Sequence, residues 1–472
     1  MTTAPNPHAS LRVTLPGIAI CLLAVACERS PAPADSDGAP FSVLPNLLLI
    51  SIDTLRADRL SLYGYSRPTS PRLDQVAAES IVFDRFYYNG GGTLPSHMSL
   101  FTALHPATHG IGPESAKTLE PERLTLTEAL RARGYATAAF TDGGWIAGKF
   151  GFAQGFDEYH ETGGGFAASV PKAEAWLAGR APDRPFFLFL HSYDVHSSWK
   201  SLPYDCPGEA ELDFAGHPPE GFNGCKRGLC ASTLLADSNA RVQAGAARLD
   251  DLFSPAELRY ISDLYDGCVR WTDARLGDFF DGLRGEGLWE NTLVVILSDH
   301  GEEFGEHGAL LHDQGGYEEL ARIPLLIKPV GPRRAERRVD GLAAMVDVMP
   351  TVLDLLGSSA PPEVQGSSLV PAIAERRTRR PNVHMYSVLR DGRFKYFSDE
   401  RRIFDLAADP GEHANLFAGR PDLAAGLERT VRDLIAVDHA AALDFSRRNP
   451  LAPPATLSEE EAARLRSLGY VR

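Results

Sequence analysis

Two apolar segments of the sequence each end in residue types that commonly bind metal ions. Residues 46–52 (NLLLISI) precede Asp53, and residues 292–298 (TLVVILS) precede Asp299 and His300. Short apolar runs of this length are typical of buried strands. The carboxyl ends of parallel strands meet at one edge of a sheet, where α/β proteins bind ligands. The sequence therefore predicts that Asp53, Asp299 and His300 hold a divalent metal ion.

A possible nucleophile lies between these two runs. Gly90, Gly91 and Gly92 lead into Thr93-Leu-Pro-Ser-His97. The glycines allow a sharp turn, and the proline suits the first turn of a helix. We therefore expect Thr93 at a helix N-terminus, which favours anions. Beside a divalent cation a hydroxyl can lose its proton and attack phosphorus or sulfur. Taken alone, a Gly-Gly-Thr segment would indicate only a helix cap.

The elements that must position these residues alternate between strands and helices from residue 46 to about residue 360. This alternation predicts an α/β fold in which helices flank a large, mostly parallel sheet on both faces. Residues 323–328 form a strand candidate that Pro324 places near a sheet edge. Beyond residue 381, short apolar runs at 382–388, 393–397 and 402–404 and a helix from about 421 to 437 predict a small C-terminal antiparallel sheet with one helix.

The first 26 residues are similar to a bacterial lipoprotein signal peptide. Their apolar run, residues 13–26, is too short to span a bilayer and ends in small residues before Cys27. We expect lipidation of Cys27, a flexible tether over residues 27–44, and a location in the bacterial cell envelope, with the lipid as the only membrane anchor. An ordinary signal peptide that is cleaved nearby is the alternative.

Besides Cys21 in the removed segment and the lipidated Cys27, four cysteines are left: Cys206, Cys225, Cys230 and Cys268. In an oxidising compartment they predict two disulfides, and three pairings are open. A zinc site is the competing interpretation. Three of these cysteines lie in residues 201–250, a glycine- and proline-rich stretch that we interpret as an insertion into a catalytic domain of residues 45–374. Residues 375–472 then form a C-terminal subdomain.

The charge of the chain limits its partners. Its 472 residues carry a formal net charge of −15, without a basic tract, which argues against a nucleic-acid binder. An anionic substrate would then need a locally positive site, for which a divalent metal is the simplest source.

These motifs together resemble the sulfatase family of the alkaline phosphatase superfamily. The resemblance covers nearly all of the mature chain, and it implies the fold of that superfamily. It rests on residues 46–53, 93–97, 189–196, 298–302, 305–308, 346–351, 366–369, 403–406, 409–412 and 415–416.

The resemblance implies one divalent metal ion, held by Asp53, Thr93, Asp299 and His300. Many sulfatases carry a second aspartate directly after the first, and here that position is Thr54. The remaining donors suit manganese or zinc at least as well as calcium or magnesium.

The position of the nucleophile departs from the sulfatase pattern. Sulfatases oxidise a cysteine or serine to formylglycine, which Thr93 cannot become, and the arginine that supports formylglycine is replaced by His97. A group bound to threonine must instead leave by attack at phosphorus or sulfur. This favours phosphate and phosphonate esters over sulfate esters.

The resemblance also implies roles for residues around the nucleophile. His196 matches the family histidine that contacts the transferred group or the leaving oxygen, and His312 lies where sulfatases often have a lysine. Both are predicted to be catalytic. His97 and Arg56 are predicted to bind the substrate, although Arg56 could instead pair with Asp58.

The sequence thus predicts an exported, metal-dependent hydrolase of small-molecule, glycan or lipid esters. Three alternatives stay open: a sulfuric ester hydrolase proper, a transferase that moves a phospho-group to an envelope acceptor, and a catalytically degenerate binding lipoprotein.

Overall fold

The computed structural model describes residues 44–113, 117–198, 201–210, 212–312, 315–332, 335–449, 452–459, 462 and 465. The predicted signal peptide, the lipidated Cys27 and all of the tether except residue 44 lie outside this range. Among the helices that are described, none has the length and apolarity that a membrane crossing requires.

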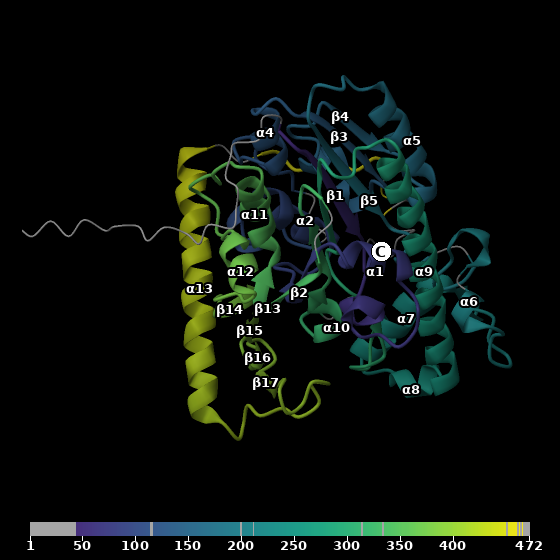
Figure 1. Cartoon of the computed structure of the whole chain (residues 1–472). Coiled ribbons are helices and arrows are strands. Elements are labelled where there is room, and N and C mark those ends of the chain that lie inside the picture. Colours follow the sequence, from purple (N-terminus) through teal and green to yellow (C-terminus); the bar gives the residue numbers. More distant parts are fainter. Residues whose placement is uncertain are drawn as a thin grey trace, which may run out of the picture. The chain divides into compact units, whose positions relative to one another are not determined.

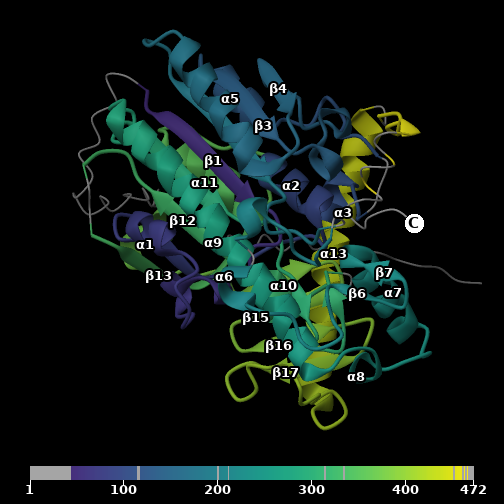
Figure 2. The same ribbon diagram turned by 90° about the vertical axis from the view of Figure 1, so that its right-hand side faces the viewer.

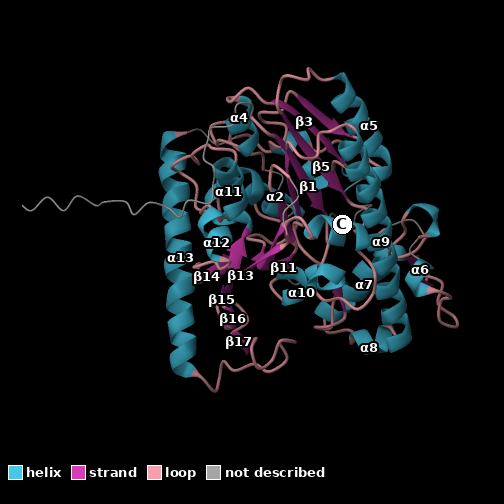
Figure 3. Ribbon diagram, viewed as in Figure 1, coloured by secondary structure: helices cyan, strands magenta, loops and turns pink. Residues whose placement is uncertain are grey.

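A nine-stranded sheet lies at the centre of the described part of the chain (Figures 1 and 3). Its order is β11-β2-β12-β8-β1-β5-β3-β4, and β13 pairs with β2. The strands from β8 to β4 are parallel, whereas β12 is antiparallel to both of its neighbours. The α/β prediction is therefore confirmed, with a mixed sheet. The strands are β1 (Asn46–Ile52), β2 (Ile81–Tyr87), β3 (Ala136–Thr141), β4 (Glu158–Glu161), β5 (Phe186–Ser192), β8 (Thr292–Leu297), β11 (Arg322–Ile323), β12 (Leu325–Lys328) and β13 (Arg337–Ala344).

The predicted edge position of residues 323–328 is wrong. Pro324 separates β11 from β12, and β12 lies inside the sheet between β2 and β8. Proline has no N–H to donate to a ladder. The strand is therefore interrupted at that residue, and pairing resumes on its far side.

Helices cover both faces of the sheet, because its central strands are buried on both sides. Every residue of β1 is buried. Leu47 and Leu49 belong to one hydrophobic core, and Leu48 and Ile50 belong to the other. The first core includes α2 (Thr93–Thr102), α4 (Leu126–Arg131) and α11 (Val348–Leu355). The second includes α1 (Pro71–Ala77), α5 (Gly165–Gly179) and α9 (Pro255–Gly285), which crosses in front of the sheet in Figure 2.

Two disulfides join the four cysteines in the described part of the chain. Cys206 pairs with Cys268 on α9, and Cys225 pairs with Cys230. The first bridge attaches the insertion to a core helix. The insertion contains α6 (Leu212–Ala215), β6 (Cys225–Lys226), β7 (Leu229–Cys230), α7 (Ala231–Gln243) and α8 (Leu249–Leu252).

The C-terminal residues form an antiparallel sheet that packs against one long helix (Figure 1). The sheet has four strands rather than the three predicted, because the chain turns at Tyr386, where φ is 52°. Its strands are β14 (Asn382–Met385), β15 (Val388–Asp391), β16 (Phe394–Phe397) and β17 (Arg402–Asp405). Helix α13 (Pro421–Arg448) runs beyond the predicted end at residue 437, since residues 440–442 are alanines, which favour helix.

The remaining short elements connect these parts. They are α3 (Pro106–His109), β9 (Glu303–Phe304), β10 (Leu310–Leu311), α10 (Glu318–Ala321) and α12 (Val370–Glu375).

Candidate metal and catalytic site

Three neighbouring strands deliver polar side chains to one edge of the sheet. Strand β1 lies between β5 and β8 and is parallel to both, and Ser51 is in register with His191 on β5 and with Leu297 on β8. Asp53 follows β1, and Asp299 follows β8. The side chains beyond the ends of these strands are therefore brought together by register alone.

Asp53, Asp299 and His300 form a buried cluster. One ligand atom from each lies within 4.8 Å of the others, and no side chain is more than 2% exposed. Asp53 Oδ1 and Asp299 Oδ2 have no hydrogen-bond partner among the described residues. Buried carboxylate oxygens without partners are costly. The cluster thus has the donor types and the unused oxygen atoms that a divalent metal ion requires.

Backbone geometry orients the ligands on the β8 side. Asp299 Oδ1 accepts hydrogen bonds from the backbone N–H groups of Thr54 (3.2 Å) and His300 (2.9 Å). Thr54 adopts a φ of 58°, which is uncommon for a β-branched residue and often marks functional sites. His300 Nδ1 lies 2.9 Å from the Gly301 carbonyl oxygen. Donation to that oxygen leaves His300 Nε2 as the lone-pair atom.

The electrostatics of the cluster favour a cation. Burial and the charge of Asp299 raise the pKa of Asp53 well above its usual value. Burial also opposes ionisation of Asp299, but His300 and His97 hold its pKa below the usual value. Burial lowers the pKa of His300 to about 4. The imidazole is thus neutral at physiological pH and able to bind a metal ion.

Thr93 joins this cluster as the first residue of α2. Its Oγ1 lies 3.1 Å from Asp53 Oδ2 and 3.3 Å from His300 Nε2. Gly92 precedes it with a φ of 101°, which side chains other than glycine rarely tolerate. At Gly90 an added Cβ would lie only 2.9 Å from the Cβ of Pro95. The glycine run therefore allows the tight turn that places the hydroxyl against Asp53 and His300.

His196 and His312 continue the site beyond His300. The ring of His312 lies 4.7 Å from that of His300 and 5.0 Å from that of His196, measured between centroids. His312 Nδ1 lies 3.0 Å from Glu302 Oε1, and burial and His312 lower the pKa of His196 well below its usual value. The structure thus brings both predicted catalytic histidines next to the cluster of Asp53, Asp299 and His300.

The two residues that were predicted to bind the substrate, His97 and Arg56, both contact protein groups in the structure. His97 is fully buried behind Thr93, with Nδ1 2.8 Å from the Thr93 carbonyl oxygen and Nε2 2.9 Å from Ser51 Oγ. Arg56 donates to both carboxylate oxygens of Asp58 and to Glu306 Oε1. His97 therefore braces the first turn of α2, and Arg56 is held by an ion-pair network with Asp58 and Glu306.

His191 is a site residue that the sequence reasoning missed. Its side chain is fully buried at the end of β5, and Nε2 lies 3.4 Å from Asp53 Oδ2. The available signal was a third apolar run, residues 186–190, that ends in a metal-ligand residue type. Its role became visible only when β5 paired with β1.

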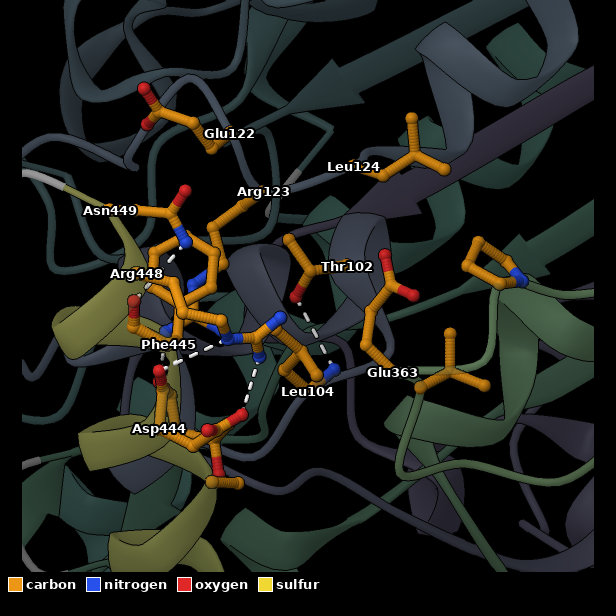
Figure 4. Close-up of a pocket in the computed structure, with 14 residues that line it drawn as sticks. Thr102, Leu104, Glu122, Arg123, Leu124, Glu363, Asp444, Phe445, Arg448 and Asn449 are labelled. Atoms are coloured by element: carbon orange, nitrogen blue, oxygen red, sulfur yellow. Dashed lines mark hydrogen bonds and ion pairs between the residues drawn. The ribbon is translucent and has the colours of Figure 1, made fainter.

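A separate cavity of about 440 Å³ lies between α2 and α13 (Figure 4). It is lined by residues that include Thr102, Leu104, Arg123 and Phe445. Thr102 and Thr93 are at opposite ends of α2, roughly 14 Å apart at 1.5 Å per residue. This cavity is therefore distinct from the cluster around Thr93.

Comparisons with known proteins agree with the fold. The Sulfatase family profile matches residues 45–358. The chain is 27% identical over 479 residues to the multifunctional alkaline phosphatase superfamily protein PehA of Trinickia caryophylli, with 80% of this chain and 92% of that protein covered. It is 24% identical over 467 residues to an N-acetylglucosamine-6-O-sulfatase of Bacteroides thetaiotaomicron, with 79% and 82% covered.

Solved structures show the same fold. The phosphonate monoester hydrolase of Agrobacterium radiobacter superposes with a TM-score of 0.63 at 21% sequence identity, with 84% of this chain and 96% of that chain covered. A structure determined in complex with D-glucosamine-2-N,6-O-disulfate gives a TM-score of 0.64 at 21% identity, with 85% and 98% covered. The match of the family profile over most of the chain shows that this protein belongs to the sulfatase family and is an ester hydrolase.

Proposed function

We propose that the protein is a metal-dependent hydrolase that cleaves phosphate or phosphonate esters through a Thr93 nucleophile. The observation that carries this proposal is the position of Thr93 Oγ1, which lies 3.1 Å from Asp53 Oδ2. It belongs to a cluster in which two carboxylate oxygens have no hydrogen-bond partner among the described residues. Thr93 follows the N-cap residue of α2, which is Gly92, and its hydroxyl donates to the carboxylate of Asp53.

The residues that would hold the metal ion are Asp53, Asp299, His300 and the Thr93 hydroxyl. A bound divalent ion neutralises charge on the transferred group and lowers the pKa of the hydroxyl. Asp53 accepts the hydrogen bond of Thr93 and orients Oγ1. His97 holds the backbone carbonyl of Thr93 and so restricts the position of the first turn of α2.

The two histidines beyond His300 suit the departure of the leaving group. The ring of His312 lies next to that of His300, and the ring of His196 lies next to that of His312. Glu302 orients His312 by its contact with Nδ1. Burial keeps His196 neutral, since it lowers its pKa. A neutral imidazole with an N–H can donate a hydrogen bond to the oxygen of a leaving group and so stabilise the charge that develops there.

The side chain of Thr93 supports phosphorus esters as the preferred substrates. Threonine carries one hydroxyl and cannot form the hydrated aldehyde of formylglycine, so the group that it takes up must leave by a second attack at the central atom. Relatives of both kinds exist: a phosphonate monoester hydrolase shares the fold, and an N-acetylglucosamine-6-O-sulfatase shares the sequence. Sulfate esters are therefore the second candidate substrates.

A substrate screen tests this proposal. Wild-type protein and Thr93→Ala are assayed with a bis-aryl phosphate, an aryl phosphonate and an aryl sulfate, each with added manganese or zinc. We expect turnover of the phosphorus esters and a loss of at least about 10³-fold in the variant. Preferential cleavage of the sulfate would decide for a sulfuric ester hydrolase. Transfer of the phospho-group to an added alcohol would indicate a transferase. Equal turnover by the variant would exclude Thr93 as the nucleophile, and no metal uptake would favour a degenerate binding protein.

We also propose export and lipid anchoring through Cys27. The support is the short apolar run that ends before Cys27 and two disulfide pairs, which are typical of exported proteins. Metabolic labelling with palmitate checks this: wild-type protein should be labelled, and Cys27→Ala should not. Equal labelling of the variant would contradict the proposal.

A further inference from the structure

A second group of buried metal-ligand residues lies beyond the C-terminal end of α2. His105 precedes α3, His384 is on β14, and Asp438 is on α13. One ligand atom from each lies within 4.8 Å of the others, and each residue is at least nine-tenths buried. None of these residues belongs to the cluster around Thr93. The group therefore joins three segments that are distant in the sequence.

One member of this group has an unused nitrogen. His384 Nε2 lies 2.7 Å from Asp438 Oδ2, and the His105 ring lies 4.1 Å from the His384 ring, at an angle of 36°. His105 is 7% exposed, and its Nδ1 has no hydrogen-bond partner among the described residues. Leaving a buried ring nitrogen unpaired costs about 1–3 kcal/mol. The local protein structure alone does not offset this cost.

Gln365, which does not belong to the group, forms hydrogen bonds with two of its members. Gln365 Nε2 donates to Asp438 Oδ1 at 2.8 Å, and Gln365 Oε1 accepts the backbone N–H of His105 at 2.7 Å. Metal-binding carboxylates are commonly oriented by a hydrogen bond to their second oxygen. Gln365 thus holds Asp438 in the orientation that a metal ligand needs, with Oδ2 facing the histidines.

We infer that His105, His384 and Asp438 form a second, structural metal site that binds zinc or a similar transition-metal ion. Two imidazoles and a carboxylate are donors that zinc prefers, and water can supply the fourth ligand. Zinc bonds of about 2.0–2.1 Å separate tetrahedral donors by roughly 3.3 Å. The hydrogen bond between His384 and Asp438 therefore opens when the ion enters, and both atoms become ligands.

The charges around the site are compatible with a cation. Burial and His384 lower the pKa of His105 to about 3, so His105 is neutral at physiological pH. Arg380 also faces His105, but its Nε donates to Asp347 at 3.0 Å. Asp438 supplies the negative charge: although burial opposes its ionisation, His384 keeps its pKa below the usual value.

Such an ion would attach the C-terminal helix to the catalytic half of the chain. Asp438 lies just beyond the predicted end of α13, and Thr108 Oγ1 donates to its carbonyl oxygen at 3.3 Å. A ligand that binds only the folded state stabilises it in proportion to the logarithm of its free concentration. Zinc is therefore expected to stabilise α13 on α3 and β14, independently of catalysis.

The test uses full-length protein in which the catalytic site carries Asp299→Asn. Each variant is stripped with a chelator and titrated with zinc by calorimetry. We expect Asp299→Asn to bind one zinc ion per chain, and the added changes His105→Phe or Asp438→Asn to abolish this binding. The added change His109→Gln is the control, since His109 is buried nearby on α3 but outside the group, and zinc binding should persist.

A second measurement does not depend on the folding of the ligand variants. Cobalt is added to Asp299→Asn, and pulsed electron paramagnetic resonance counts the coupled imidazole nitrogens. Two coupled imidazoles support the inference. No zinc uptake by Asp299→Asn, or a bound cobalt ion without imidazole coupling, overturns it and leaves a hydrogen-bonded histidine–aspartate pair. Retention of zinc by His105→Phe overturns it as well.

Discussion

Replacing Asp299 by asparagine should have opposite effects on the stability of the metal-free protein and on metal binding. Asp53 and Asp299 are fully buried, and each has an oxygen without a hydrogen-bond partner. Without a cation the two carboxylates repel each other, which is one reason why the pKa of Asp53, raised first by burial, lies well above its usual value. In Asp299→Asn the amide oxygen can still accept the N–H groups of Thr54 and His300. The amide nitrogen can donate to Asp53.

The size of the effect follows from the geometry. The ligand atoms lie within 4.8 Å of one another, and two full charges at that distance repel by about 3 kcal/mol at an effective dielectric constant of about 20. Protonation of Asp53 already relieves part of this repulsion at neutral pH. We therefore expect the variant to be more stable than wild type by about 1–2 kcal/mol in chelator, with a rise in Tm of roughly 2 °C. Manganese affinity should fall by more than about 100-fold, since even outer-shell changes cost about 10- to 100-fold.

Thermal and urea unfolding in chelator, followed by the same scans with manganese, measure both effects. Manganese suits this readout because it binds nitrogen donors weakly and so reports little on other histidine sites. Asp273→Asn is the matched control: its buried carboxylate accepts backbone N–H groups of Arg72 and Leu73, so the change should not raise stability or alter manganese affinity. An Asp299→Asn variant that is less stable than wild type in chelator, or that binds manganese equally well, would refute the reasoning.

Three further predictions concern single residues. Thr93→Ser should retain activity within about tenfold, because the hydroxyl remains and one buried methyl group is worth about 1 kcal/mol; initial rates measure this, and an inactive serine variant would contradict it. His191→Gln should weaken manganese binding by about 10-fold without changing the circular dichroism spectrum, because His191 Nε2 lies 3.4 Å from Asp53 Oδ2; unchanged affinity would exclude the role. Burial and neighbouring carboxylates raise the pKa of Glu303 to about 9. Between about pH 4.5 and 9 the folded state therefore retains a proton that the unfolded state releases. The free energy of unfolding falls as the pH rises through this range. Glu303→Gln should remove this loss, and its free energy of unfolding in urea at pH 8 should exceed that of wild type by about 1 kcal/mol or more. If the stabilities of the two proteins change with pH in parallel, the prediction is wrong.

Much of the architecture could be predicted because it depends on local patterns. The largely apolar run at residues 46–52, which predicts a buried strand, is a local signal that the structure confirms as β1. The edge position of β12 was wrong, because a proline marks an interruption in the ladder without saying which strands lie on either side. The length of α13 was underestimated, although residues 440–442 are alanines, which favour helix. The contact between Asp438 of this helix and His384, 54 positions away, could not be read from a local pattern.

Some residues of the candidate site could be identified from local patterns, and others could not. Asp53, Thr93, Asp299 and His300 could be identified from the sequence, because each follows a strand or opens a helix. Arg56 could not be assigned, because a cation three residues after a ligand can face either a substrate or a carboxylate. The structure shows that it pairs with Asp58 and Glu306.

By itself, the sequence determined the fold class, the family motifs and the residue types that can bind a metal ion, since strand periodicity and helix caps are properties of neighbouring residues. Only the tertiary structure decided which of these side chains meet. Strand order placed His191 beside Asp53, and the packing of α13 brought Asp438 to His105 and His384. The physical reason is that convergence of distant side chains depends on register and packing, which no local pattern encodes.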